Sequence, residues 1–216
     1  ADRPALLLYT SGTTGTPKGV MLTQRNLATN LRDLAAAWRL SPQDQLVHAL
    51  PLFHVHGLVL GLYGGVFFTR GLHWLPKFKP ELLLAALAAS APGHAVLYAV
   101  PTMYTRLLDF IEAAATPHET IKPLAQARLL VSGSAPLPMR EHERMQRLTG
   151  RGIVERYGMT ETLITCAVTA EAPDPGWVGP PLPSVALRLV DEHGAEVARD
   201  GETFGEIQVR GPSIFS

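Results

Sequence analysis

Short apolar runs alternate with longer amphipathic stretches along most of the chain. Brief apolar runs are typical of strands, and apolar positions that repeat every three or four residues are typical of helices. The apolar runs predict strands near residues 5–9, 45–50, 94–99 and 127–131. Helical spacing predicts helices over 80–90, 102–114 and 138–149, each at or just after a proline, whose missing N–H costs little in a first turn. This order predicts an α/β fold, a largely parallel sheet flanked by helices.

A further helix is predicted after Thr23. Thr23 carries the short hydroxyl side chain that caps a helix N-terminus, and leucines then recur at three- and four-residue steps from Leu27 to Leu34. The pattern continues to Trp38 and stops before Pro42. The stretch is therefore predicted to be one amphipathic helix with a buried face.

The pattern of apolar and polar residues changes beyond about residue 175. Apolar and polar residues alternate over 185–190 and again over 206–210, which predicts an antiparallel β region. We therefore divide the chain into an α/β region, residues 1–175, and a β region of the same domain, residues 176–216. Both ends of the chain fall beside a strand without a capping element, as expected for a segment of a longer chain.

Composition narrows the class of partner. Apolar residues make up 46% of the 216 residues and the mean hydropathy is +0.11, which argues against disorder. The 19 basic residues balance 19 acidic ones, so charge gives no support for binding to nucleic acid or a membrane surface, and we expect a small-molecule partner. No secretory signal and no apolar stretch of about 20 residues is visible. The single cysteine, Cys166, excludes an internal disulfide and favours a cytoplasmic location.

A loop rich in hydroxyls and glycines follows the first predicted strand. Residues 9–19 read Tyr-Thr-Ser-Gly-Thr-Thr-Gly-Thr-Pro-Lys-Gly, so backbone N–H groups, hydroxyls and one ammonium can surround phosphate oxygens. The loop differs from the P-loop of common NTPases, because Pro17 and Gly19 flank Lys18 where that motif has Gly and then Ser or Thr. The composition predicts a phosphate clamp, and a solvated linker is the alternative.

A second polar cluster, residues 155–161, follows a short predicted strand over 152–154. Its sequence is Glu-Arg-Tyr-Gly-Met-Thr-Glu. Carboxylates, a guanidinium and a phenol at a strand end can supply a metal ligand, an anion partner and a stacking surface, although charges at strand ends are often only solvated. Alternation along an extended strand would turn Arg156 away from Tyr157.

At these two motifs the sequence resembles the adenylate-forming acyl-CoA synthetase superfamily. Three more segments extend the resemblance, namely 51–57 (Pro-Leu-Phe-His-Val-His-Gly), 132–137 (Ser-Gly-Ser-Ala-Pro-Leu) and 205–211 (Gly-Glu-Ile-Gln-Val-Arg-Gly). The five segments stand in the family's order and span nearly the whole chain. The resemblance implies an internal part of the large N-terminal domain of a longer enzyme. It also implies that a ribose-binding Asp, a hinge and a mobile C-terminal domain with a catalytic Lys lie beyond Ser216.

The resemblance implies roles for individual residues. It assigns the β- and γ-phosphates of ATP to Thr10, Ser11, Gly12, Thr13, Thr14, Gly15 and Lys18. It assigns adenine to Ser134, Ala135, Pro136 and the ring of Tyr157, and it places Gly158 beside the nucleotide. It places Thr160 at the α-phosphate and assigns Mg²⁺ to Glu161. The acyl group is expected to face Ser132, His54, Arg156 and Met159. The implied catalytic set is Lys18, Thr160, Glu161 and His54.

Within the superfamily the sequence is most similar to malonyl-CoA synthetases. Arg156 stands where many acyl-CoA ligases have a small Gly before the Tyr, and residues 75–78 (Leu-Pro-Lys-Phe) and the His-Val-His-Gly segment resemble the same subgroup. An unpaired second carboxylate would be expensive to bury in an acyl pocket, whereas Arg can bind it through two parallel N–H donors. The implied reaction joins malonate, or a substituted malonate, to coenzyme A with ATP and Mg²⁺.

Two alternatives stay open. A medium-chain or aryl acyl-CoA ligase would share the nucleotide motifs but has no need of Arg156, and a catalytically incomplete segment that only binds nucleotide would share them all. Zinc at His54 and His56 is disfavoured, because no third His, Cys or paired acid lies nearby in the sequence. Cys166 lacks the sequence context of a nucleophile and is expected to be a buried, inert thiol.

Overall fold

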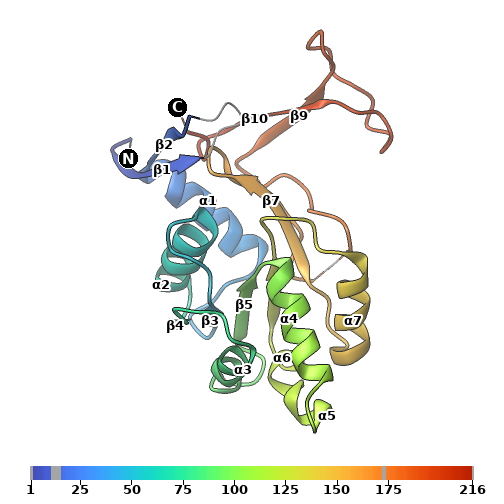
Figure 1. Ribbon diagram of the computed structural model, residues 1–216. Helices are drawn as coiled ribbons and strands as arrows, with labels where there is room; N and C mark the ends of the chain where they lie inside the picture. The colour runs from blue at the N-terminus through green and yellow to red at the C-terminus, as the bar shows by residue number, and fades with distance from the viewer. Residues whose placement is uncertain (1, 11–15, 172–173, 216) are drawn as a thin grey trace.

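A six-stranded sheet forms the centre of the protein (Figure 1). The computed structural model describes residues 2–10, 16–171 and 174–215. The sheet has the order β4-β3-β5-β6-β7-β8, with β3 at Gln45–His48, β4 at Gly71–Trp74, β5 at Ala95–Ala99, β6 at Leu129–Ser132, β7 at Val154–Met159 and β8 at Leu163–Ala167. All neighbours are parallel except β7 and β8, so the prediction of a largely parallel sheet is confirmed.

Helices lie against the sheet in two groups. The first group contains α1 (Gln24–Ala37), the π-helix η1 (His56–Tyr63) and α2 (Gly64–Phe68). The second contains α3 (Pro80–Ala88), α4 (Pro101–Glu112), α5 (Pro117–Thr120), α6 (Lys122–Ala125) and α7 (Met139–Thr149). Figure 1 shows α1 and α2 at the left and α4, α6 and α7 at the right. The predicted helices near 80–90, 102–114 and 138–149 are therefore confirmed. Across the described ranges, no helix has both the length and the apolar character that a bilayer crossing demands.

Helix α1 begins as the sequence predicts. The Thr23 hydroxyl accepts a hydrogen bond from the Asn26 N–H at 3.2 Å, and the Asn26 side chain accepts one from the Thr23 N–H at 2.8 Å. This reciprocal capping satisfies two N–H groups that a helix terminus would otherwise leave unpaired. Further along, Asn30 exchanges hydrogen bonds with the backbone of Ile164, which ties the buried face of α1 to β8.

The hydrophobic core is built around β5, a strand of the central sheet whose residues are almost all apolar. All five residues of β5 are buried, as expected for a strand covered on both faces by helices. Trp38, Tyr98 and Tyr104 are the largest fully buried side chains. The polar atoms of Trp38 and Tyr104 form hydrogen bonds with backbone carbonyls, as buried aromatic N–H and O–H groups usually do. Trp38 donates to the Val168 carbonyl at 3.1 Å, and Tyr104 donates to the Val131 carbonyl at 3.1 Å.

The first predicted strand does not join the central sheet. The run near 5–9 forms β1 (Pro4–Thr10), which pairs antiparallel with β2 (Lys18–Thr23) in a separate two-stranded sheet. The pairing of β1 with β2 is antiparallel because parallel neighbours need a crossover of about a dozen residues or more, and residues 11–17 are too few. The two strands therefore form a hairpin.

The later part of the chain forms the antiparallel pair that the alternation predicts. β9 (Ala186–Val190) pairs with β10 (Glu206–Arg210), and the ribbon extends away from the main sheet at the upper right of Figure 1. The division at residue 175 stays a prediction. The sequence analysis did not predict several short elements that the structure describes, namely β2, β4, β8, η1, α2, α5 and α6.

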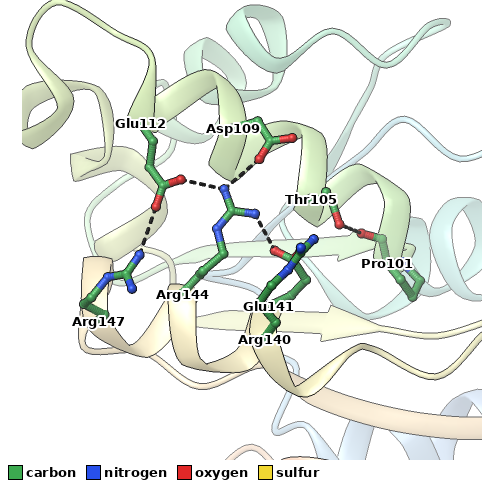
Figure 2. A network of polar contacts seen from close by, with 8 residues as sticks. All are labelled: Pro101, Thr105, Asp109, Glu112, Arg140, Glu141, Arg144 and Arg147. Carbon is green, nitrogen blue, oxygen red and sulfur yellow. Dashed lines mark hydrogen bonds and ion pairs between the residues drawn. The ribbon is translucent and has the colours of Figure 1, made fainter.

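Helices α4 and α7 are joined by ion pairs centred on Arg144 (Figure 2). Arg144 contacts Asp109 and Glu112 of α4 at 2.7 Å each, and it contacts Glu141 of α7 at 2.8 Å. The Glu141 side chain is fully buried, and Arg140 is its other cation. Because the Arg144 side chain is only 12% exposed, solvent and salt screen these pairs less than they screen surface pairs. The network fixes α7 beside α4.

Arg144→Ala should lower the free energy of unfolding of the full-length protein by roughly 2–4 kcal/mol, because buried Glu141 and both α4 carboxylates lose a partner. Arg147→Ala removes one exposed pair, to Glu112 at 3.1 Å. It should therefore change the free energy of unfolding by less than about 1 kcal/mol. Urea unfolding at neutral pH measures both variants, and equal losses would contradict a stabilising role for the network.

Candidate functional site

A cleft of about 340 Å³ lies at the carboxyl ends of the parallel strands. Segments that follow different strands line it, including Leu50 after β3, Val100 after β5 and Ser134 after β6, together with Arg156 in β7. In open α/β sheets ligands bind outside the carboxyl ends of the strands, where the connecting loops converge. This cleft is therefore the candidate functional site.

Arg156 is the charged group at the base of this cleft. It is 7% exposed, and its Nη2 lies 3.4 Å from the Ser134 hydroxyl, while its Nε has no hydrogen-bond partner. Among the described residues, no carboxylate lies within ion-pair distance of its guanidinium. Burial lowers the pKa of Arg156 to about 10, and Tyr98 opposes that shift, so the side chain stays charged at neutral pH. A buried cation in this state can bind an anion.

Gly133 allows the backbone to pass directly over Arg156. A Cβ at this position would collide with the guanidinium, so any other residue would force Arg156 to move. The next residue, Ser134, adopts a φ of +74°, in the left-handed region that side chains disfavour. The loop after β6 is thus shaped around the guanidinium.

His56 completes the polar lining of the cleft. It is 5% exposed, its Nδ1 lies 3.3 Å from the Ser134 hydroxyl, and its Nε2 has no partner. Burial lowers the pKa of His56 well below its usual value, and the electrostatic effects of Arg156 and His48 add to this. His56 is therefore a neutral imidazole at physiological pH, able to donate from one nitrogen and accept at the other.

The predicted site residues at and after the end of β6 differ in their exposure to solvent. Ser134, Ala135 and Pro136 are exposed, so they are accessible to a ligand. Ser132 ends β6 and is fully buried, with no partner for its hydroxyl. Within the described part of the cleft, Ser134 rather than Ser132 is the serine beside Arg156.

The second polar cluster lies inside β7 and the turn that follows it. Tyr157 is half-buried and pairs with Cys166 of β8, and the register shifts between Tyr157 and Gly158. A Cβ at Gly158 would collide with the Leu163 carbonyl, so the tight β7–β8 hairpin requires glycine there. Met159 is exposed and lines the cleft.

Thr160 and Glu161 form the turn between β7 and β8. Both are half-buried, and Thr160 lines the cleft. The Glu161 carbonyl accepts a hydrogen bond from the Phe215 N–H at 3.1 Å. This bond brings residues near the end of the described chain against the turn.

The proposed phosphate clamp is described only at its two ends. Thr10 and Lys18 are register partners of β1 and β2, and Lys18 is exposed. Between them, Ser11, Gly12, Thr13, Thr14 and Gly15 lie outside the described residues. The base of the hairpin is linked to the β7–β8 turn, because Asn26 donates to the Pro212 and Ile214 carbonyls and Phe215 bonds to Glu161.

Glu161 is a candidate ligand for a cation. In the part of the chain that the structure describes, no group of three or more His, Cys, Asp or Glu residues converges as a metal site. Mg²⁺ usually binds to one or two carboxylates together with substrate phosphates and water, so a lone carboxylate suits it.

The chain was compared with known families and structures. The family described as AMP-binding enzyme matches residues 1–216. The chain belongs to this family. The mitochondrial malonate–CoA ligase of Mus musculus is 39% identical over 99% of this chain. Among solved structures, a malonyl-CoA ligase in a ternary product complex with methylmalonyl-CoA and AMP is 50% identical with a TM-score of 0.87 over 99% of the chain. An o-succinylbenzoate CoA synthetase of Bacillus subtilis in complex with ATP and a magnesium ion is 29% identical, with a TM-score of 0.81, also over 99%.

The chain spans less than half of each of these relatives. It covers 41% of the mouse ligase, 44% of the malonyl-CoA ligase chain and 42% of the Bacillus subtilis chain. The fold matches the N-terminal domain of adenylate-forming enzymes, so the resemblance that the motifs indicated is confirmed.

The sequence analysis did not predict His56 as a residue of the candidate site. It assigned the His-Val-His-Gly segment to the acyl group through His54, which lines the cleft but is exposed. His56, two residues later, begins η1 and points its imidazole toward Ser134. The available signal was the apolar segment 57–63 that follows it, which predicts burial of the residue at its start.

Acidification should destabilise the fold through His48. Burial lowers the pKa of His48 to about 4, whereas an unfolded chain titrates near 6.5. The unfolded state therefore binds more protons in this interval, so stability is complete above about pH 6.5 and falls as the pH drops toward 4.

His48→Asn tests this pH dependence, because the Asn oxygen can still accept the Leu50 N–H that His48 Nδ1 accepts at 3.1 Å. The full-length wild type should lose roughly 1–2 kcal/mol between pH 7 and pH 5, and the variant should lose measurably less. Urea unfolding at the two pH values measures the slope, and exposed His193→Asn is the control. The same pH slope in wild type and His48→Asn would contradict the prediction.

Proposed function

We propose that the full-length protein is an AMP-forming acid–CoA ligase that makes malonyl-CoA, or a substituted malonyl-CoA, from the dicarboxylate, ATP and coenzyme A. One observation carries the proposal. The Arg156 guanidinium is buried in the cleft, and no carboxylate of the described residues pairs with it. Burying an uncompensated charge is costly, so the site favours a ligand that brings an anion. The distal carboxylate of malonate is such an anion.

The groups around Arg156 suit a carboxylate. The Ser134 hydroxyl, 3.4 Å from Arg156 Nη2 and 3.3 Å from His56 Nδ1, has a proton that it can donate to a bound oxygen. Neutral His56 adds hydrogen bonding without a second positive charge. An apolar acyl chain would leave these polar atoms unpaired, which disfavours it. The names of the mouse ligase and of the malonyl-CoA ligase structure support the same substrate class.

The reaction proposed here has two steps. A malonate carboxylate attacks the α-phosphorus of ATP, pyrophosphate leaves, and malonyl-adenylate forms. The thiol of coenzyme A then attacks the acyl carbon and displaces AMP. The first step needs little proton transfer, so positioning of the reactants and neutralisation of phosphate charge carry most of its catalysis.

The nucleotide is proposed to bind along the loops that surround the cleft. Lys18 and Thr10 would act with Ser11, Gly12, Thr13, Thr14 and Gly15 at the β- and γ-phosphates, and Thr160 at the α-phosphate. Ser134, Ala135, Pro136 and Tyr157 would hold adenine, with Gly158 beside it. His54 and Met159, which line the cleft, are proposed on the acyl side, whereas Ser132 is fully buried and does not line it. The exposure of Ser134, Ala135 and Pro136 supports this assignment, since a nucleotide can reach them.

We also propose that Glu161 holds Mg²⁺. When bound, Mg²⁺ would neutralise phosphate charge as pyrophosphate leaves. The half-buried carboxylate one residue after Thr160 supports this role. The related Bacillus subtilis synthetase was solved with ATP and magnesium.

We propose a cytoplasmic location, because the one cysteine, Cys166, is a free thiol and a reducing compartment keeps thiols free. Burial raises the pKa of this thiol, which keeps it unreactive. The mouse relative is named a mitochondrial enzyme, so fractionation of cells that express the full-length protein decides between the two compartments.

Arg156→Ala tests the substrate. In the full-length protein, kcat/KM for malonate should fall about 100-fold or more, because the distal carboxylate loses its buried partner. The value for butyrate, which has no second carboxylate, should stay the same or rise. Pyrophosphate release measures both substrates, and Arg147→Ala, an exposed arginine, is the control. An equal loss for both substrates would assign Arg156 to the fold or to ATP, and a wild type that prefers butyrate would favour a medium-chain ligase instead.

Glu161→Gln tests the metal ligand. The variant keeps the size of the side chain and removes its charge, so kcat should fall about 10-fold or more and the Mg²⁺ concentration for half-maximal activity should rise, while the thermal unfolding midpoint is retained. Pyrophosphate release across a Mg²⁺ titration measures this. Glu192→Gln, with a side chain 88% exposed, is the control. Unchanged Mg²⁺ dependence would exclude Glu161 as the ligand.

A further inference from the structure

Glu155, the residue before Arg156, is buried and does not belong to the cleft. It is 4% exposed, and successive residues of a strand face opposite sides of the sheet, so Glu155 points away from the side that Arg156 faces. A buried carboxylate needs partners for both of its oxygens. The identity of those partners indicates what it does.

The Glu155 carboxylate joins three separate segments. Its Oε2 accepts the Leu137 N–H at 3.0 Å. Its Oε1 lies 2.9 Å from His142 Nε2 of α7 and accepts the Gly176 N–H at 3.2 Å. Desolvation opposes ionisation, but the hydrogen bonds from His142, Leu137 and Gly176 outweigh it and lower the pKa of Glu155. The carboxylate is thus held in its charged form.

Glu155 holds the adenine loop, residues 133–136, at both ends. At the start of the loop, Ser132 of β6 is the register partner of Glu155 in β7, so the two backbones lie side by side. At the end of the loop, the Leu137 N–H donates to the Glu155 carboxylate, and α7 begins two residues later. The loop between these points contains the left-handed Ser134, a conformation that persists only where the surroundings hold it.

We propose that Glu155 is a positioning residue for the nucleotide: its carboxylate sets the adenine loop through the Leu137 N–H, and it couples the loop to α7 through His142 and to the segment at Gly176. The inference rests on the proposed function, because it assumes that this loop holds adenine. It does not require malonate to be the acid. Glu155 touches no substrate, and it acts through the loop alone.

The experiment measures ATP affinity of the full-length protein by calorimetry, without any acid substrate, in Glu155→Ala and Glu155→Gln. Glu155→Ala leaves two N–H groups without an acceptor, so the Kd for ATP should rise about 10-fold or more. Glu155→Gln keeps one acceptor oxygen for the two N–H groups, so its Kd should rise about 3-fold, a partial rescue. Glu141→Gln is the matched control, since Glu141 is as buried and paired with arginines but touches no part of the loop. It should lower the thermal unfolding midpoint and leave the Kd for ATP unchanged.

Unchanged Kd for ATP in both Glu155 variants, or an equal rise in Glu141→Gln, would overturn the inference and leave the proposed function intact. If Glu155→Ala does not fold, the comparison of Glu155→Gln with Glu141→Gln decides. A wild type that binds no ATP overturns the proposed function and this inference together. A wild type that binds ATP but does not activate malonate overturns only the choice of substrate.

Discussion

The arrangement of the cleft depends on one buried guanidinium. Arg156 is 7% exposed and has no carboxylate partner among the described residues, so the protein carries the cost of desolvating a charge that it does not neutralise itself. The surrounding chain is adapted to that charge. Gly133 leaves room for it, Ser134 takes up a left-handed backbone beside it, and His56 stays neutral next to it. These features are the basis for the proposal that the cleft binds an anion.

Strand β7 presents opposite chemistry to its two sides. Arg156 serves the cleft, and Glu155, directly before it, is satisfied within the protein by Leu137, His142 and Gly176. The one side chain leaves a charge available to a ligand, and the other fixes the loop that borders the same cleft. This division explains why two adjacent buried charges of opposite sign do not pair with each other.

The support for this strand continues outward through the helices. His142 lies on α7, and Glu141, its neighbour, is held by Arg144, which also reaches the two carboxylates of α4. Helix α4 in turn packs Tyr104 against the carbonyl of Val131 in β6. These contacts hold α7, which carries His142, beside α4 and behind the sheet's polar strand β7.

The sequence by itself determined the parts of this protein that depend on local pattern. The continuous apolar run of β5, the capping Thr23 of α1 and the alternation of β9 and β10 each predict the observed element, because burial on two faces, a helix terminus and a half-exposed ribbon leave a short-range signature. Of the motif residues, His54, Ser134, Arg156, Gly158, Met159 and Thr160 line the cleft in the described part of the chain, and Ser132 does not. Only the tertiary structure decided how they gather. It placed β1 and β2 in a separate hairpin, put Ser134 rather than Ser132 beside Arg156, added His56, and gave Glu155 its three partners. Those outcomes depend on contacts between residues far apart in the chain, and the local spacing of residues carries no record of such contacts.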